Sequence, residues 1–178
     1  FRTLRILANE KAKILLLSER TKLLYTDPLT GLKNRTCFKH MEDDFDSMSF
    51  PQIIIMADMN DLKTTNDLYG HHMGDLLIKQ CSEILNYGCH IFRMGGDEFL
   101  LVCPYDENLD VEDQIDSVNR IASTAIITDG KEEIIGLCIA MGASHRKNIH
   151  DDFNAKMIEA DNKMYIHKKH LKKNSCKK

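Results

Sequence analysis

The chain has 178 residues, 43% of them hydrophobic, and a net charge of −3 at pH 7. This length and composition are typical of one globular domain that can bury a core without disulfides or metals. The weak charge gives no overall attraction to nucleic acid or to an acidic membrane surface. No apolar run approaches the ~20 residues of a membrane helix, and no signal peptide is recognisable. Because the net charge is weak, we expect no nucleic-acid partner.

The first 25 residues predict a helix, because they are rich in Leu, Lys, Glu and Arg and contain neither Gly nor Pro. Apolar residues recur at spacings of three and four, but Lys11 and Thr21 interrupt them. A coiled-coil stalk and an ordinary helix lying on the domain therefore both stay open. Asp27-Pro28 ends the helix, since proline disfavours the α conformation in the residue before it. The chain has no initiator Met and opens within this helix, so we expect a fragment of a longer protein.

Helices and strands then alternate along the chain. Asn34 is a suitable N-cap for a helix to about residue 47, and "QIIIMAD" over 52–58 predicts a central strand. Gly95 and Gly96 predict a hairpin turn between "IF" and "FLLV", because glycine tolerates the positive φ of tight turns. Further patterns predict helices over 73–87, 111–121 and 153–164 and strands over 124–128 and 132–144. The irregular alternation indicates an α+β domain with a mostly antiparallel sheet.

The cysteines give no sign of cross-linking. There are six, at positions 37, 81, 89, 103, 138 and 176, and none of them forms a CxxC pair. Several lie within apolar runs. This pattern predicts reduced core residues of a cytoplasmic protein rather than a disulfide framework or a zinc site.

Two acidic residues stand at the ends of predicted strands. Asp58 ends the strand over 52–58, and Asp97 lies at the tip of the hairpin. If these strands are neighbours in one sheet, the two carboxylates meet at one edge. Adjacent carboxylates repel each other unless a cation lies between them, and a hard divalent ion with oxygen ligands suits them. Such a layout serves nucleotidyl transfer, although strand ends and turns are often acidic for solubility alone.

The segment from Asp58 to Asp75 is polar and punctuated by glycine, where the strand leads to the next helix. Backbone N–H groups freed by such a turn, together with Lys63, are suited to phosphate. The amide of Asn66 and the carboxylate of Asp75 match the donors and acceptor of guanine. Each residue also has a purely structural interpretation: Asn66 as a helix cap, Asp75 as an acid in a first turn and Lys63 as a surface residue.

Four motifs identify a family. "DPLTGLKNRTCF", "DMNDLKTTNDLYGHHMGD", "RMGGDEF" and "ADNKMYIHKKHLKK" occur in the order and spacing of the GGDEF-type diguanylate cyclase domain, which the chain resembles from residue 27 to about 172. The resemblance implies a palm-like fold, as in adenylyl cyclases and polymerases, with about five strands surrounded by helices. It also implies condensation of two GTP molecules into cyclic di-GMP and two pyrophosphates. The implied division is a signalling helix over 1–26 and the catalytic domain over 27–178.

The resemblance assigns the metal-binding residues. Asp58 and Asp97 match the metal carboxylates, and Met59 matches the position that offers a backbone carbonyl. Glu98 is expected to assist the metal or the deprotonation of the ribose 3′-hydroxyl. The implied cofactor is Mg²⁺, with Mn²⁺ as an alternative ion.

The resemblance also assigns the GTP-binding residues. Lys63 and Lys168 match the phosphate-contacting lysines, with Lys172 as a third, and Asn66 and Asp75 match the guanine-binding residues. Turnover implies a homodimer, because each domain holds one GTP. An upstream sensor is implied too, and membrane anchoring of the intact protein stays open.

Some positions depart from the family. Asn60 replaces a frequent aspartate, and His167-Lys168 replaces a small residue before lysine. Asn86 and Cys89 stand where many members carry the Arg and Asp of a product-inhibition motif, so we expect that inhibition to be absent. The alternatives are a catalytically silent GGDEF domain that binds GTP or mediates dimerisation, and a cyclase with relaxed base choice.

Overall fold

The computed structural model describes residues 2–86, 88–105 and 110–175. The elements in chain order are α1 (Arg2–Tyr25), β1 (Lys33–Asn34), α2 (Arg35–Met41), the 3₁₀ helix η1 (Glu42–Ser47), β2 (Gln52–Met59), α3 (Leu62–Tyr69), α4 (His71–Ile84), β3 (His90–Arg93), β4 (Glu98–Pro104), α5 (Val111–Ser123), β5 (Ile126–Thr128), β6 (Glu133–Ile135), β7 (Ile139–Arg146) and α6 (Phe153–Ser175).

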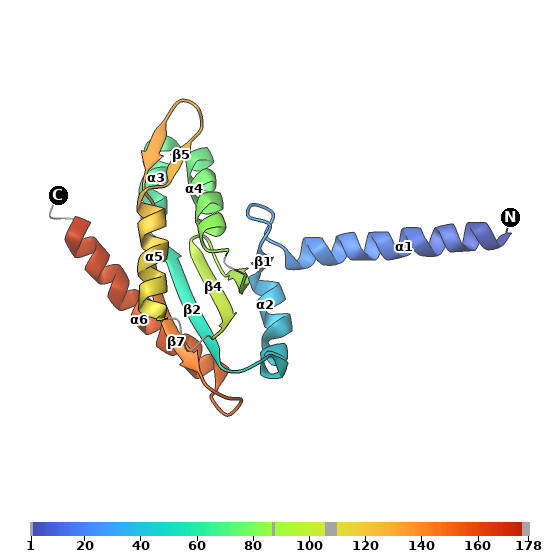
Figure 1. Cartoon of the computed structure of the whole chain (residues 1–178). Helices are drawn as coiled ribbons and strands as arrows, with labels where there is room; N and C mark the ends of the chain where they lie inside the picture. Colours follow the sequence, from blue (N-terminus) through green and yellow to red (C-terminus); the bar gives the residue numbers. More distant parts are fainter. Residues whose placement is uncertain (1, 87, 106–109, 176–178) are drawn as a thin grey trace.

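A five-stranded sheet in the order β1-β3-β4-β2-β7 organises the fold, with helices around it (Figure 1). The short β1 runs parallel to β3, and the other three pairings are antiparallel. Strands β3 and β4 form the predicted hairpin, and β2 lies between β4 and β7. The predicted α+β fold with a mostly antiparallel sheet is confirmed.

Alternation along the strands divides the core between the two faces of the sheet. On one face, α4 and α5 cover Ala57 and Phe99, together with Leu101. On the other face, α2 and α6 cover Ile54 and Leu100 in a cluster of stacked and edge-on phenylalanine rings. Asp58 and Glu98 share the strand parity of this second face, so their side chains lie on the α6 side.

Three predicted elements differ in extent from the structure. Residues 62–69 form the separate helix α3, where we expected a turn that leads into one helix. The helix that Asn34 caps ends at Met41 and continues as the 3₁₀ helix η1. The single strand predicted over 132–144 is wrong, because Gly136, with a φ of 89°, separates β6 from β7. The first half then pairs with β5 in its own two-stranded sheet.

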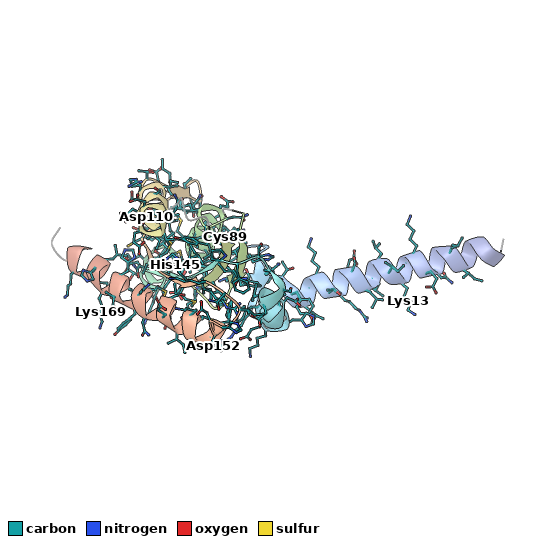
Figure 2. All side chains as sticks on the ribbon, turned by 60° about the horizontal axis from the view of Figure 1, so that its bottom comes forward. Lys13, Cys89, Asp110, His145, Asp152 and Lys169 are labelled. Carbon is teal, nitrogen blue, oxygen red and sulfur yellow. A yellow bond between two sulfur atoms is a disulfide. The ribbon has the colours of Figure 1, made fainter. Side chains whose placement is uncertain are left out.

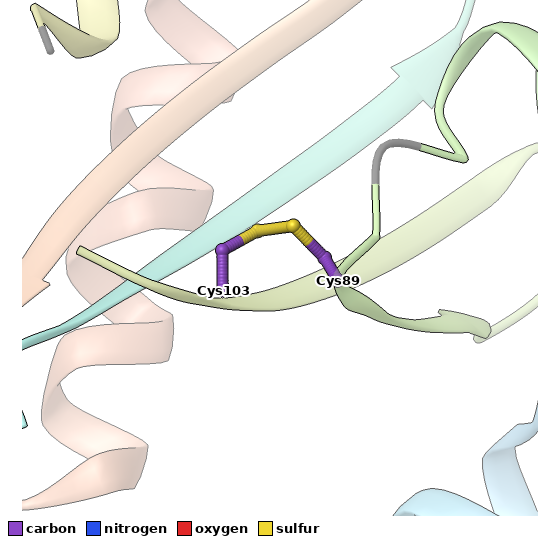
Figure 3. Close-up of a disulfide and its surroundings, with 2 residues drawn as sticks. All are labelled: Cys89 and Cys103. Carbon is purple, nitrogen blue, oxygen red and sulfur yellow. A yellow bond between two sulfur atoms is a disulfide. The ribbon is translucent and has the colours of Figure 1, made fainter. Parts of the chain in front are cut away.

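A disulfide joins Cys89 to Cys103, so the prediction that the cysteines are all reduced core residues is wrong (Figure 3). The register explains the pairing, since Ile91 lies opposite Leu101 and His90 opposite Val102. The next pair outward is therefore the two cysteines, 4.7 Å apart at their Cα atoms. A search for short cysteine spacings misses a pairing that hairpin register creates. Cys37 and Cys81 are buried free thiols and Cys138 is a half-buried one, whereas Cys176 lies outside the described residues.

Helix α1 extends away from the rest of the chain, and side chains project from it on all sides (Figure 2). Its exposed large apolar residues are Ile6, Leu7, Ile14, Leu15, Leu16, Leu17, Leu23 and Leu24. This arrangement differs from a helix packed along the domain. Within the described ranges, no helix combines the length and the apolar content needed to cross a membrane.

Candidate active site

Strands β2 and β4 bring the acidic residues together at one end of the sheet. Asp58 lies directly opposite Glu98 in the antiparallel register. Asp97 is the next residue into the hairpin turn, and its carbonyl accepts a hydrogen bond of 2.9 Å from the backbone N–H of Met59. Burial is the largest cause of the raised pKa of Asp58, and the charge of Asp97 adds to it. The structure therefore brings together the three acids that the sequence analysis selected.

Lys168 on α6 forms an ion pair with this acidic cluster. Its Nζ donates a hydrogen bond of 2.6 Å to Oδ1 of Asp58, whose side chain is only 8% exposed. Burial raises the pKa of Asp58 above its ordinary value, and the Lys168 hydrogen bond and charge oppose that rise. The charge of Lys172, one helical turn further, acts in the same direction as Lys168. A cation at Asp58 thus offsets the cost of burying the carboxylate.

The hairpin tip is stabilised by an arginine that the sequence analysis did not assign to the site. Arg93 donates from Nη1 to both carboxylate oxygens of Asp27, at 2.9 and 3.1 Å. Its Nη2 donates to the carbonyl of Gly96 at 2.8 Å, and its Nε to that of Gly95 at 3.2 Å. The guanidinium therefore links Asp27, in the segment after α1, to the turn that presents the acids. Its place within "RMGGDEF" was the signal available in the sequence.

Helices α3 and α4 bring the predicted guanine-binding residues close together. Oδ1 of Asn66 is buried with no hydrogen-bond partner among the described residues, and it lies against Gly74. A Cβ at position 74 would collide with it, which explains the glycine there. Asp75 follows directly and is exposed on α4. The structure thus brings Asn66 and Asp75 onto neighbouring helices, with the carboxylate exposed and the amide oxygen buried without a partner.

Asn60 and Lys63 lie in the turn from β2 into α3 and differ in their exposure. Lys63 is exposed in the first turn of α3. Asn60 is buried, and its amide donates to Sγ of Cys138 at 3.3 Å, so it is directed away from the acidic cluster. Between them Asp61 has a φ of 64°, in the left-handed region that aspartate tolerates better than most residues. This turn carries the chain from β2 into α3.

The position of α6 depends on polar contacts with the edge strand β7. Nδ1 of His167 lies 3.1 Å from both the N–H and the carbonyl of Met141, and Lys163 donates to the carbonyl of Ala143 at 2.8 Å. A Cβ at Gly142 would collide with the α6 backbone, so a glycine there permits close packing. These contacts set the helix register that places Lys168 beside Asp58. These contacts also give a structural role to His167, which stands where the family usually has a small residue.

The carboxylates of this cluster suit a hard divalent ion whose coordination shell is completed by the substrate. Within the residues that the structure describes, no group of three or more His, Cys, Asp and Glu side chains is placed to hold a metal. Magnesium is usually held by one or two carboxylates together with substrate phosphates and water, rather than by an all-protein cage. The carboxylates of Asp58, Asp97 and Glu98, which lie at the same end of β2 and β4, fit that requirement.

The sequence profile described as "Diguanylate cyclase, GGDEF domain" matches residues 24–174. The chain belongs to this family. Diguanylate cyclase DgcP of Escherichia coli is 40% identical over 95 residues, which cover 49% of this chain and 28% of DgcP. Diguanylate cyclase DosC of Escherichia coli is 30% identical over 154 residues, 80% of this chain and 33% of DosC. The chain thus spans about a third of the length of these curated relatives.

Solved structures support the fold independently. The coiled coil and GGDEF domain of DgcB from Caulobacter crescentus, crystallised in complex with c-di-GMP, aligns with a TM-score of 0.77 at 22% identity and covers 93% of this chain and 94% of that one. Diguanylate cyclase SiaD of Pseudomonas aeruginosa, in complex with its activator SiaC, aligns with a TM-score of 0.70 at 21% identity, over 95% of this chain and 69% of SiaD.

Proposed function

We propose that this GGDEF domain is an active diguanylate cyclase that condenses two GTP molecules into cyclic di-GMP with release of two pyrophosphates. One observation carries the proposal: Asp58 and Glu98 are cross-strand neighbours, with Asp97 beside them and Lys168 bound to Asp58. The family membership supports the same reaction class.

The residues divide the chemistry between them. Asp58, Asp97 and the carbonyl of Met59 would hold Mg²⁺ or Mn²⁺, which neutralises charge on the α-phosphate and favours the 3′-alkoxide. Glu98, opposite Asp58 in the register, is the further carboxylate that would accept the proton of the 3′-hydroxyl. When a nucleotide binds, Lys168 exchanges Asp58 for phosphate oxygens, with Lys63 and Lys172 as additional cations.

The base is held at the α3–α4 pair. The side-chain amide of Asn66 and the exposed carboxylate of Asp75 are the groups that would hydrogen-bond the donors and acceptor of guanine. Adenine presents a different donor pattern, so this pair favours GTP over ATP.

Each chain supplies half of the reaction centre, and two chains must meet so that each 3′-hydroxyl faces the other α-phosphate. Holding two substrates in line is worth up to about 7–11 kcal/mol of activation free energy. The exposed apolar residues of α1 suit a second copy of this helix and supply a means of pairing the domains. Coupling to an upstream sensor would then act through α1.

Mass spectrometry of the product after incubation with GTP and Mg²⁺ tests the proposal. Cyclic di-GMP should form from GTP and no cyclic dinucleotide from ATP, and the rate per chain should rise with protein concentration. Asp58→Asn should remove activity, whereas Asp116→Asn on the exposed face of α5 should leave it intact. GTP binding without any product would favour the silent-module alternative.

A further inference from the structure

An apolar cavity lies on the face of the sheet opposite the acidic cluster. It has a volume of about 410 Å³ and lies between the sheet, α5 and the segment after α4. Ile53 and Ile55 of β2, with Leu101 and Cys103 of β4, form its floor. These are odd-numbered strand positions, whereas Asp58 and Glu98 are even-numbered and lie on the α6 side. The cavity is therefore separate from the candidate active site.

The walls are apolar and rich in sulfur. Val111, Ile115 and Val118 of α5 form the roof. The disulfide of Cys89 and Cys103 closes one side, and the thioether of Met141 lies at another. Sulfur makes favourable contacts with the edges of aromatic rings. Such a wall is suited to an aromatic ligand.

The charge and size of the cavity narrow the choice of occupant. Among the described residues, none of those that line it is charged, and its side-chain polar groups come from Gln114, Ser117 and the phenol of Tyr105. Its volume equals roughly fourteen molecules of liquid water, and water is poorly held between apolar walls. Two turns of a partner's α-helix, ~10 Å wide and ~12 Å long, would need roughly twice that volume. Small-molecule sites typically occupy about 300–1,000 Å³.

We propose that this cavity binds a small uncharged aromatic molecule, independently of the proposed cyclase activity. The ligand would lie between α5 and the sheet, with its ring against the disulfide and Met141. Gln114, which is exposed at the mouth, is placed to contact a polar substituent.

Isoleucine methyl NMR of the full chain can test this site directly, with the uncharged aromatic probe 1-N-phenylnaphthylamine as titrant. The residues Ile53, Ile55, Ile115 and Ile121 line the cavity and report on its occupancy. The exposed Ile6 and Ile14 report non-specific binding to α1, and the exposed Ile158 reports non-specific binding to α6. We expect saturable shifts of the four cavity methyls and none at the other three.

Two variants should weaken the binding that causes those shifts, because a phenylalanine narrows the cavity. Val118→Phe enlarges the roof, and Ile121→Phe does so at a residue that is 48% exposed, where the fold tolerates change more readily. Ile158→Phe, a similar enlargement on α6, should keep wild-type binding. The proposal is overturned if the cavity methyls do not move up to the solubility limit of the probe. It is also overturned if Ile6 and Ile14 shift at the same concentrations.

Discussion

The two ends of the β3–β4 hairpin are held together by different forces. At the tip, Arg93 bonds to Asp27 and to the turn carbonyls, and the acids project from this end. At the base, the Cys89–Cys103 disulfide crosses between the strands (Figure 3). The same disulfide lines the apolar cavity. The polar tip presents charges that can act on a ligand, whereas the base contributes mainly stability.

This difference separates function from stability within one short element. A substitution at the tip removes a group that few core contacts depend on, so it should alter chemistry more than folding. A substitution at the base should alter the free energy of unfolding and leave the acidic cluster in place. The following predictions test that separation.

Replacing Asp97 with alanine should have the largest effect. The loss of a charge-stabilising group is expected to lower the turnover of GTP by roughly 100-fold or more. The backbone bond from Met59 to the carbonyl of residue 97 is kept, so the fold should persist. Turnover is measured by product formation, and folded fraction by circular dichroism. Turnover near wild type at equal folded fraction would contradict the proposed metal role.

Removing the disulfide should give the largest effect on stability. The crosslinked cysteines are 14 residues apart, and a loop of this length restricts the unfolded chain by about 3 kcal/mol. Cys103→Ser should therefore lower the free energy of unfolding in urea by about that amount, with turnover per folded molecule unchanged.

The serine variants also carry their own control. Cys89→Ser and the double variant should match Cys103→Ser, because all three remove the same bond, and a reductant should lower wild-type stability alike. Additive losses in the double variant would show that the thiols act separately.

Asp27→Asn should remove the ion pair with Arg93 and cost about 1–3 kcal/mol at pH 7. Burial alone would raise the pKa of Asp27, but hydrogen bonds from Thr30 and Arg93 outweigh it, so its pKa lies below the ordinary value of 3.8. A lowered folded pKa stabilises the protein above the unfolded value and loses that effect as the pH falls through the folded value. The difference between wild type and variant, measured by urea unfolding, should therefore shrink below pH 3.8. A constant difference from pH 7 to pH 2 would rule out the ionised carboxylate as its source.

Asp75→Ala should change base preference without a comparable loss of stability, because the side chain is exposed. It removes an acceptor for guanine donors, so GTP affinity should fall by roughly tenfold or more while ATP affinity changes little. Calorimetry with both nucleotides provides the measurement. An equal loss for both would indicate damage to α4 instead.

The smallest effect is expected for the binding of cyclic di-GMP near the base of the hairpin. Asn86 and the disulfide-bonded Cys89 cannot supply the planar, charged fork of an arginine and its acidic partner. Cyclic di-GMP should therefore show no binding outside the active site in calorimetry. Tight binding that survives Asn66→Ala together with Asp75→Ala would show that a separate product site exists.

The order of the elements could be predicted from local patterns. The N-cap at Asn34, the strand over 52–58 and the hairpin around Gly95 depend on residues close in sequence, and all three appear in the structure. The sequence predicts that Asp58 and Asp97 lie close together only if their strands are neighbours in the sheet. The pairing of β2 with β4 fulfils this condition.

Other features required the tertiary structure. The disulfide arises from hairpin register, and the split at Gly136 arises because β6 finds a partner in β5. The His167 contact with β7 joins segments 26 residues apart. Hydropathy and propensity describe neighbours along the chain and carry no information on which distant groups meet.

By itself, the sequence determined the family, the acidic hairpin and the residues available for nucleotide chemistry, because motif spacing and turn chemistry are local. Only the tertiary structure decided that Lys168 neutralises Asp58, that Arg93 links the hairpin tip to Asp27 in the segment after α1, and that a cavity lies behind the sheet. Each of these depends on the packing of a helix against strands distant in the chain. Such packing is set by the total burial and hydrogen bonding of the fold, which no short stretch of residues encodes.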